Sequence, residues 1–295
     1  MKKLSFWKAD WFLGLIVAIV MLVAARDDLI QSLERKAYDL GVQSASRAPS
    51  DRIAVVAIDD ASIANIGRWP WSRDVHARMT DLLAGAKAKV VANTTFFFEP
   101  QRDAGLAYVE KLLALQNEMT AQNAAGPGKA SEANDALIPM GAVLAEGKLE
   151  LNTDRKLAVS MQRAGNVVLP LVFRPLAEPQ GNPDKPLPGY VMANGMAGPA
   201  GAAALPPPGV FPLYPVAELG SAAAIGHLNA DLDVDGAVCA EPLLVRYYDK
   251  VFPALSVLVA ARSLNLGIAD IKPAWGEALQ MGTLAAAPRS AAAVS

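Results

Sequence analysis

The sequence predicts an α/β fold, in which a βαβ-built, mainly parallel sheet carries an antiparallel hairpin addition and is preceded by one transmembrane helix. Three observations lead to this prediction. Residues 51–100 pass from a β-branched apolar run through a helical pattern to a second apolar run. Asp235-Gly236 separates two segments of alternating hydrophobicity, which is a hairpin signal. Residues 11–25 form an uninterrupted apolar run.

Composition narrows the class of protein. A chain of 295 residues can bury a substantial core, as one large domain or two small ones. The net charge of −2 comes without a basic stripe, so we expect no nucleic-acid partner. Cys239 is the single cysteine, which excludes an intramolecular disulfide framework and a cysteine-based metal cluster. We expect neither a cofactor nor a metal.

The N-terminal apolar run has three possible interpretations. Lysines precede it, so we predict a cytoplasmic tail over residues 1–10 and a transmembrane helix over residues 11–27. Fifteen apolar residues are fewer than the roughly twenty that span a bilayer, and tryptophans at its start would lengthen the segment at the interface. A cleaved signal peptide is the second interpretation, because Val23-Ala24-Ala25 resembles a cleavage site, and a buried core helix is the third.

Two further boundaries follow. Residues 28–50 carry apolar side chains among charges, as a juxtamembrane helix followed by a linker would. Residues 51–295 then form the main domain.

The domain begins with the βαβ pattern. Residues 53–58 are continuously apolar and β-branched, which predicts a buried strand. Residues 73–88 follow the helical period, and residues 89–98 predict the second strand. The two strands should be parallel and joined by a right-handed crossover.

Further elements follow from periodicity and turn residues. Pro170 lies in the third strand and predicts an edge position or a bulge. Thr153 or Asp154 is the candidate cap of one helix, and Pro253 falls in the first turn of another. Residues 176–219 are rich in proline, glycine and alanine and too long for an ordinary connection, so they form a functional excursion or are poorly ordered. The predicted helices are 104–121, 137–146, 153–164 and 252–266, and the predicted strands are 166–173, 225–232 and 237–248.

Polar residues follow the predicted strands. Ligands of open α/β sheets bind outside the carboxyl ends of the strands, and Asp59 and Asp60 end the first strand. The alternative is structural: Asp59 caps a turn or helix, Asp60 is solvated and the tryptophans hold the loop to the core. The candidate ligand-binding residues are Asp59, Asp60, Trp69, Trp71, Arg73, Thr94 and Glu99.

Metal and catalytic motifs are weak. Asp231-x-Asp233-x-Asp235-Gly236 matches the opening of a calcium loop, but Pro242 stands where the bidentate glutamate belongs, so a hairpin turn is the better interpretation. His76 and His227 have no cysteine or glutamate at ligand spacing, which argues against zinc. No catalytic motif set is present, so we do not expect an enzyme.

Several segments together resemble a known family, the type-two CHASE domain. The resemblance is carried by VVAIDDASIANIGRWPWSRDVHARMTDLLAGAKAKVVA with FFFEP behind it, by LERKAYDL before it, and by GHLNADLDVDGAV and FPALSVLVAARSLNLG towards the C-terminus. The family usually has aspartate where this chain has Thr94, and often a basic residue where it has Cys239. Both departures put family roles at those positions in doubt.

The resemblance implies an extracytoplasmic sensor of a bacterial membrane receptor whose output is a kinase or nucleotide cyclase. The chain would be an N-terminal fragment with a C-terminally incomplete sensor domain, held in the inner membrane with that domain in the periplasm or outside the cell. It would bind a small-molecule or periplasmic cue and act as a homodimer. The alternative is a secreted or periplasmic α/β protein, either a small-molecule binder or a hydrolase with Asp59 and Asp60 as acid and base.

Overall fold

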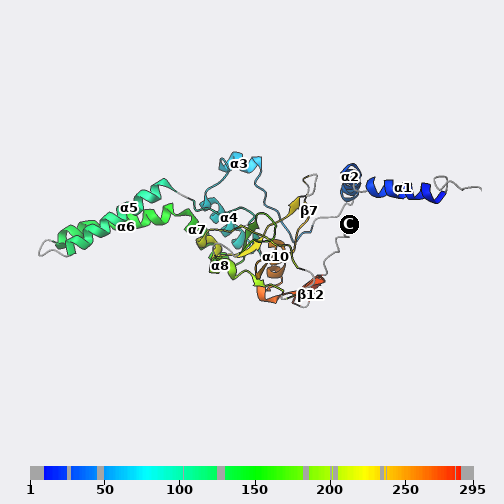
Figure 1. Cartoon of the computed structure of the whole chain (residues 1–295). Coiled ribbons are helices and arrows are strands. Elements are labelled where there is room, and N and C mark those ends of the chain that lie inside the picture. Colours follow the sequence, from blue (N-terminus) through cyan, green and yellow to red (C-terminus); the bar gives the residue numbers. More distant parts are fainter. Residues whose placement is uncertain are drawn as a thin grey trace, which may run out of the picture. The chain divides into compact units, whose positions relative to one another are not determined.

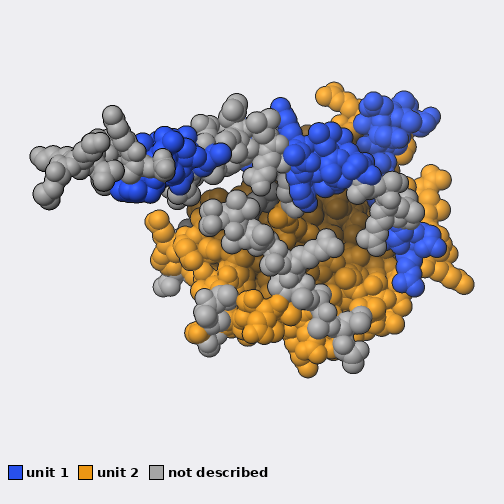
Figure 2. Space-filling view, turned by 90° about the vertical axis from the view of Figure 1, so that its right-hand side faces the viewer, with its two compact units in different colours: residues 1–65, 232–237 blue, residues 66–231, 238–295 orange. Residues whose placement is uncertain are grey.

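The computed structural model describes most of the chain as two compact units. Unit 1 comprises residues 1–65 and 232–237, and unit 2 comprises residues 66–231 and 238–295 (Figure 2). The described residues are 10–24, 28–44, 50–101, 103–124, 130–181, 186–199, 201, 205–232, 236, 238–282 and 284–286.

Unit 1 is mainly helical. The predicted apolar helix is α1 (Asp10–Ala24), and the predicted amphipathic helix after it is α2 (Asp28–Ser44) (Figure 1). In the described part of the chain, no helix has the length and apolar character needed to cross a membrane. The predicted transmembrane helix at residues 11–27 is therefore not supported by the structure.

The predicted first strand is not formed. Residues 53–58 have no strand conformation, and their apolar side chains are exposed, with Ile53 at 75% and Val55 at 86%. A strand exists only where a neighbouring backbone completes its hydrogen bonds, and no described strand pairs with this segment. β-Branched composition alone was therefore misleading. The chain turns instead into the helix α3 (Asp60–Ile66).

Unit 2 is built on a sheet with three parallel strands. β2 (Val167–Phe173) lies between β1 (Val91–Ala92) and β5 (Ala224–His227) and runs parallel to both. β4 (Pro212–Leu213) adds to β2 in the antiparallel sense. The mixed α/β class is confirmed, although β1 is much shorter than the strand predicted over residues 89–98.

Pro170 lies in the central strand of this sheet, so the predicted edge position is wrong. Asn93 donates its backbone N–H to the Val168 carbonyl, so the peptide groups of Val168, and of Pro170 two residues later, face β1. β1 has already ended at Ala92. Pro170 has no N–H with which to extend this ladder beyond Asn93, and β2 stays fully buried.

Helices cover both faces of the parallel sheet, as such sheets require. α4 (Arg73–Gly85) packs against α7 (Thr153–Ala164), and α10 (Leu255–Ser263) packs against β5 and β2. Alternate residues of β2 enter different clusters. The first contains Val167 and Leu169 with Phe97, Leu157 and Met161 from the α4–α7 side, and the second contains Val168 with Leu255, Val257 and Leu258 of α10.

Two long helices form a hairpin between β1 and β2. α5 (Ala104–Ala124) and α6 (Ala130–Leu151) lie side by side (Figure 1). The sequence predicted both, but α6 is longer than residues 137–146 and contains Pro139. The cap of α7 is neither Thr153 nor Asp154: Asn152 Oδ1 accepts a hydrogen bond from the Arg155 backbone N–H at 3.0 Å.

A second, three-stranded sheet is formed by β3, β9 and β8. β8 (Leu244–Tyr247) and β9 (Lys250–Pro253) form an antiparallel hairpin, and β3 (Met196–Ala197) pairs with β9. This hairpin was not predicted at Tyr248-Asp249. Pro253 ends β9, so it does not lie in the first turn of α10 as predicted.

The remaining short elements complete the described chain. β6 (Asp231–Leu232) pairs with β7 (Val238–Ala240), as the hairpin prediction requires, but Asp233 and Asp235 lie outside the described residues. The segment after α10 forms a three-stranded antiparallel sheet that the sequence did not predict. The other elements are α8 (Gly189–Met192), α9 (Ala217–Gly220), η2 (Ile268–Asp270), β10 (Ile271–Ala274), β11 (Ala278–Met281) and β12 (Leu284–Ala286).

Candidate functional site

Asp59 has a local structural role at the start of α3. Its Oδ1 accepts a hydrogen bond from the Ser62 backbone N–H at 2.8 Å, and its own N–H donates to Ser62 Oγ at 2.8 Å. The hydrogen bond from the Ser62 backbone holds the pKa of the Asp59 carboxyl below its usual value. Asp59 and Asp60 are both exposed. The capping interpretation is therefore realised for Asp59, and ligand contact at either carboxylate stays a prediction.

The predicted tryptophans belong to an aromatic cluster. The rings of Trp69 and Trp71 meet edge to face at 5.4 Å between centroids, and the His76 ring lies 5.8 Å from Trp69. His76 in turn lies 5.2 Å from the buried Phe97. Burial lowers the pKa of His76, and the nearby Arg73 charge lowers it further. Both tryptophans are half-buried, so they fix the loop to the core as the structural interpretation predicts.

Arg73 is the centre of a polar network beside this cluster. Its Nε donates to Asp154 Oδ1 at 3.1 Å, and its Nη2 donates to the Glu99 carbonyl at 3.1 Å. The other Asp154 oxygen accepts from the Gln101 backbone N–H at 2.8 Å. The side chains of Arg73 and Asp154 are 13% and 7% exposed. The network joins the first turns of α4 and α7 to the segment after β1.

The remaining predicted residues are exposed. Thr94 and the Glu99 side chain face solvent, and only the Glu99 backbone enters the network. Unit 2 thus brings together Trp69, Trp71 and Arg73, while Asp59 and Asp60 belong to unit 1. A single binding crevice that combines these candidate ligand-binding residues at the carboxyl ends of the strands stays a prediction.

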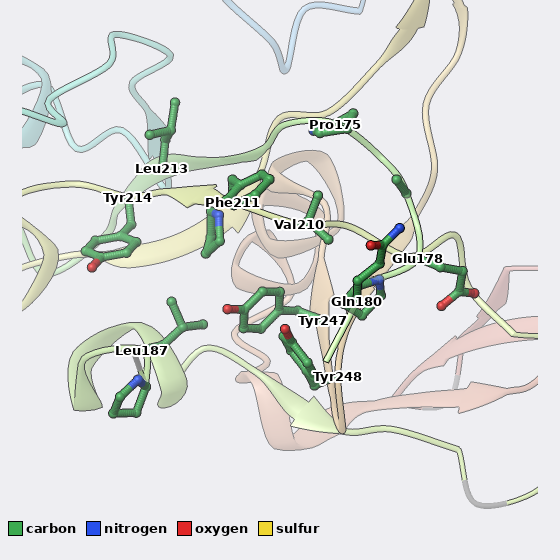
Figure 3. A pocket seen from close by; sticks show the side chains of 14 residues that line it. Pro175, Glu178, Gln180, Leu187, Val210, Phe211, Leu213, Tyr214, Tyr247 and Tyr248 are labelled. Carbon is green, nitrogen blue, oxygen red and sulfur yellow. The ribbon is translucent and has the colours of Figure 1, made fainter. Parts of the chain in front are cut away.

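Unit 2 contains a cleft whose lining residues were not among the candidates predicted from the sequence. It has a volume of about 720 Å³ and lies beyond the carboxyl end of β2 (Figure 3). Its walls are the segment after β2, the segment around β4, the chain before α8 and the end of the β8–β9 hairpin. The lining residues are Pro175, Ala177, Glu178, Pro179, Gln180, Pro186, Leu187, Val210, Phe211, Pro212, Leu213, Tyr214, Tyr247 and Tyr248.

Backbone hydrogen bonds hold two of these walls together. The Arg174 N–H donates to the Val210 carbonyl at 2.9 Å, and the Val210 N–H donates to the Pro175 carbonyl at 3.1 Å. Gly209 lies so close to β2 that an added Cβ would be 2.7 Å from the Phe173 Cβ. These contacts fix the geometry of the cleft before any ligand arrives.

The chemistry of the lining is apolar and aromatic with few charges. Tyr247 and Tyr248 meet edge to face at 4.8 Å between ring centroids. Among the described residues that line the cleft, Glu178 is the only acidic or basic side chain, and its Oε1 lies 2.7 Å from Nη2 of Arg246. Figure 3 shows the two tyrosines across the cleft from Val210 and Phe211. Such a surface suits flat, uncharged ligands with one or two hydrogen-bonding groups.

Two lining residues have unusual backbones. Phe211 has φ +46° and Tyr248 has φ +51°, both in the left-handed region that bulky residues rarely adopt. Phe211 is also 71% exposed, so packing does not account for its position. Tyr248 stands in the two-residue turn between β8 and β9, where glycine or asparagine is usual. Strained bulky residues cluster at binding sites, so this pair supports a functional cleft.

One feature of the sequence pointed towards this cleft. The proline- and glycine-rich residues 176–219 were predicted to be a functional excursion or poorly ordered, and their described part contributes to three of the four walls of the cleft. Tyr247 and Tyr248 carried no comparable signal, because they looked like ordinary strand residues. Within the described residues, no group of three or more histidine, cysteine or acidic side chains is placed to hold a metal ion.

Comparison with known proteins gives one match. A family model described as CHASE2 domain matches residues 14–292. No curated protein and no solved structure matches the chain.

Proposed function

Because the chain belongs to the CHASE2 family of extracytoplasmic sensor domains, we propose that it binds an external cue in the cleft of Figure 3 and relays binding to a kinase or nucleotide cyclase output. The observation that carries this proposal is the cleft itself. Its volume of about 720 Å³ lies in the range of small-molecule sites. Its position beyond the carboxyl end of β2 is where open α/β sheets bind ligands.

The lining defines the class of cue. Glu178 is already paired with Arg246, so a charged ligand would find no unpaired counter-charge in the lining that the structure describes. Aromatic rings and prolines offer flat apolar surfaces, and the hydroxyls of Tyr214 and Tyr248 offer hydrogen bonds. The proposed cue is therefore an uncharged aromatic or alicyclic molecule carrying a hydroxyl, carbonyl or N–H group.

Binding can be tested on the full chain with indole as the uncharged probe and indole-3-acetate as its charged counterpart. We expect saturable indole binding by NMR titration, and binding of indole-3-acetate at least 10-fold weaker. Phe211→Ala should weaken indole binding at least 5-fold. Tyr38→Ala removes an exposed aromatic ring of α2 and should leave binding unchanged. Equal binding by all three proteins would refute the assignment of the cleft.

Tyr248→Gly gives a sharper test, because glycine adopts positive φ without a steric penalty. Relief of the strained backbone should stabilise the fold by about 1 kcal/mol. Loss of the ring should at the same time weaken indole binding. A variant that is more stable but binds less would identify Tyr248 as a residue kept for function. Reduced stability with unchanged binding would show that Tyr248 serves the fold instead.

Membrane attachment through residues 11–27 is part of the proposal. α1 is apolar around its whole circumference, and its large side chains from Leu13 to Met21 are exposed. A helix of this kind needs an apolar environment to cover it. Membrane flotation of the full chain, compared with a variant carrying Leu15→Asp and Val17→Asp, tests the attachment. Equal recovery of both proteins with the lipid would argue against α1 as the anchor.

The sequence-predicted crevice and the cleft make different predictions for signalling. In the receptor that carries this chain, Trp71→Ala or Asp59→Ala should alter the response if the crevice binds the cue. Phe211→Ala should alter it if the cleft does. A hydrolase using Asp59 and Asp60 has less support, because a general acid needs a raised pKa and the pKa of Asp59 is lowered.

A further inference from the structure

The helical hairpin carries an apolar stripe that its own packing does not use. The facing sides of α5 and α6 meet in register: Val109 lies beside Gly147, and Gln116 beside Gly141. Gln116 Nε2 donates to the Leu137 carbonyl at 3.1 Å, which fixes that register. After Gly105, the half-buried positions of α5 follow a heptad spacing along this contact. They are Leu106, Val109, Leu113, Gln116, Thr120 and Asn123.

A second set of α5 residues faces away from this contact. Tyr108, Leu112, Leu115 and Met119 are 67%, 49%, 55% and 50% exposed. Their spacings of four, three and four residues are those of the a and d positions of a coiled coil. We call these four residues the α5 stripe. An exposed apolar stripe with heptad spacing is typical of a helix that pairs with another helix.

The charges beside the stripe identify the partner. Lys111 precedes Leu112 by one residue, and Glu118 precedes Met119 by one residue, so both occupy g positions. In an antiparallel pair of α5 helices, Tyr108 packs on the partner's Met119 and Leu112 packs on the partner's Leu115. That register places Lys111 opposite the partner's Glu118, and two-fold symmetry repeats the pair.

A parallel pair lacks this complementarity. There the g positions face the partner's e positions, which hold the uncharged Gln116 and Asn123. We propose that α5 is a homodimer interface, in which the stripes of two copies pair antiparallel and Lys111 of each copy faces Glu118 of the other. The mixed charges beside the stripe do not favour an anionic membrane surface as the partner.

The interface should be weak in isolation and strengthened by tethering. Four apolar side chains from each copy bury less surface than a standard stable interface does. Confinement to one membrane would raise the effective concentration of the two copies. A weak interface of this kind can form or separate in response to a cue, as a sensor requires. The inference does not depend on the identity of the cue or on the cleft.

Charge exchange tests the pairing on the full chain by sedimentation equilibrium. Lys111→Glu and Glu118→Lys each create two like-charge pairs across the two-fold axis, and each should weaken dimerisation at least 5-fold. The double variant restores both pairs and should return the dimer to near the original affinity. Glu146→Lys, on the exposed surface of α6, is the matched control and should change nothing. Equal effects of the single and double variants would overturn the proposed register, and a monomer at every concentration would overturn the interface.

Cysteine cross-linking decides the orientation. In a Cys239→Ser background, chains with Tyr108→Cys should cross-link to chains with Met119→Cys, while neither variant should cross-link to itself. The two positions lie about 16 Å apart along the helix at roughly 1.5 Å per residue, so the geometries are distinct. Self-cross-linking of each variant would instead indicate a parallel pair and refute the antiparallel interface. Circular dichroism confirms that each variant is folded.

Discussion

A buried histidine should make the stability of unit 2 fall in mild acid. His227 lies in β5 and is fully buried. Its Nδ1 accepts a hydrogen bond from the Asn229 backbone N–H at 3.3 Å, and its Nε2 has no hydrogen-bond partner within the described part of the chain. Burial disfavours the charged imidazolium and lowers the pKa of His227 to about 3.

The sign and size of the effect follow from proton linkage. The unfolded chain protonates this histidine with an ordinary pKa of 6.5, whereas the folded protein does so only near 3. Between these values the unfolded state holds more protons, so the free energy of unfolding decreases as the pH falls. From about pH 7.5 to about pH 5, the His227 contribution should lower the free energy of unfolding by about 2 kcal/mol.

The assay is urea denaturation of the full chain at a series of pH values, followed by far-ultraviolet circular dichroism. His227→Leu removes the titrating group. Over the same pH range, the decrease in the free energy of unfolding should therefore be about 2 kcal/mol smaller for the variant than for the original protein. His76→Leu is the comparison variant. The pKa of His76 is also lowered, so its titration also decreases the free energy of unfolding as the pH falls. A His227→Leu protein with the same pH dependence as the original would refute the reasoning.

Three further predictions concern the fold, each measured as a change in the free energy of unfolding. Arg73→Met leaves the buried carboxylate of Asp154 without its cation and should cost about 3 kcal/mol, and addition of Asp154→Asn should recover part of that loss. Gly226→Ala places a methyl group 2.8 Å from the Leu255 Cα and should cost about 2 kcal/mol, because a backbone atom cannot move aside as a flexible side chain can. A loss below about 0.5 kcal/mol would mean that α10 moves freely away from β5. Met161→Ala empties a fully buried position on α7 and should cost about 3 kcal/mol, and a neutral result would show that the core there is loosely packed.

The sequence by itself determined the parts of the fold that local patterns encode. The helical period located α4, α5, α7 and the middle of α10, because each helix forms its hydrogen bonds within its own segment. The apolar run within residues 166–173 predicted β2 as a strand, although not its central position. The combined motifs identified the family that the comparison confirms.

The tertiary structure decided everything that depends on a distant partner. Residues 53–58 have the composition of a strand, but no described strand pairs with them. Pro170 lies in a central strand at the point where the pairing with β1 ends. The cleft is assembled from segments around Pro175, Phe211 and Tyr248, whose proximity follows from strand pairing and not from spacing along the chain. The physical reason is that periodicity reports which face of a segment is apolar, whereas the partner of that face is set by the packing of the whole unit.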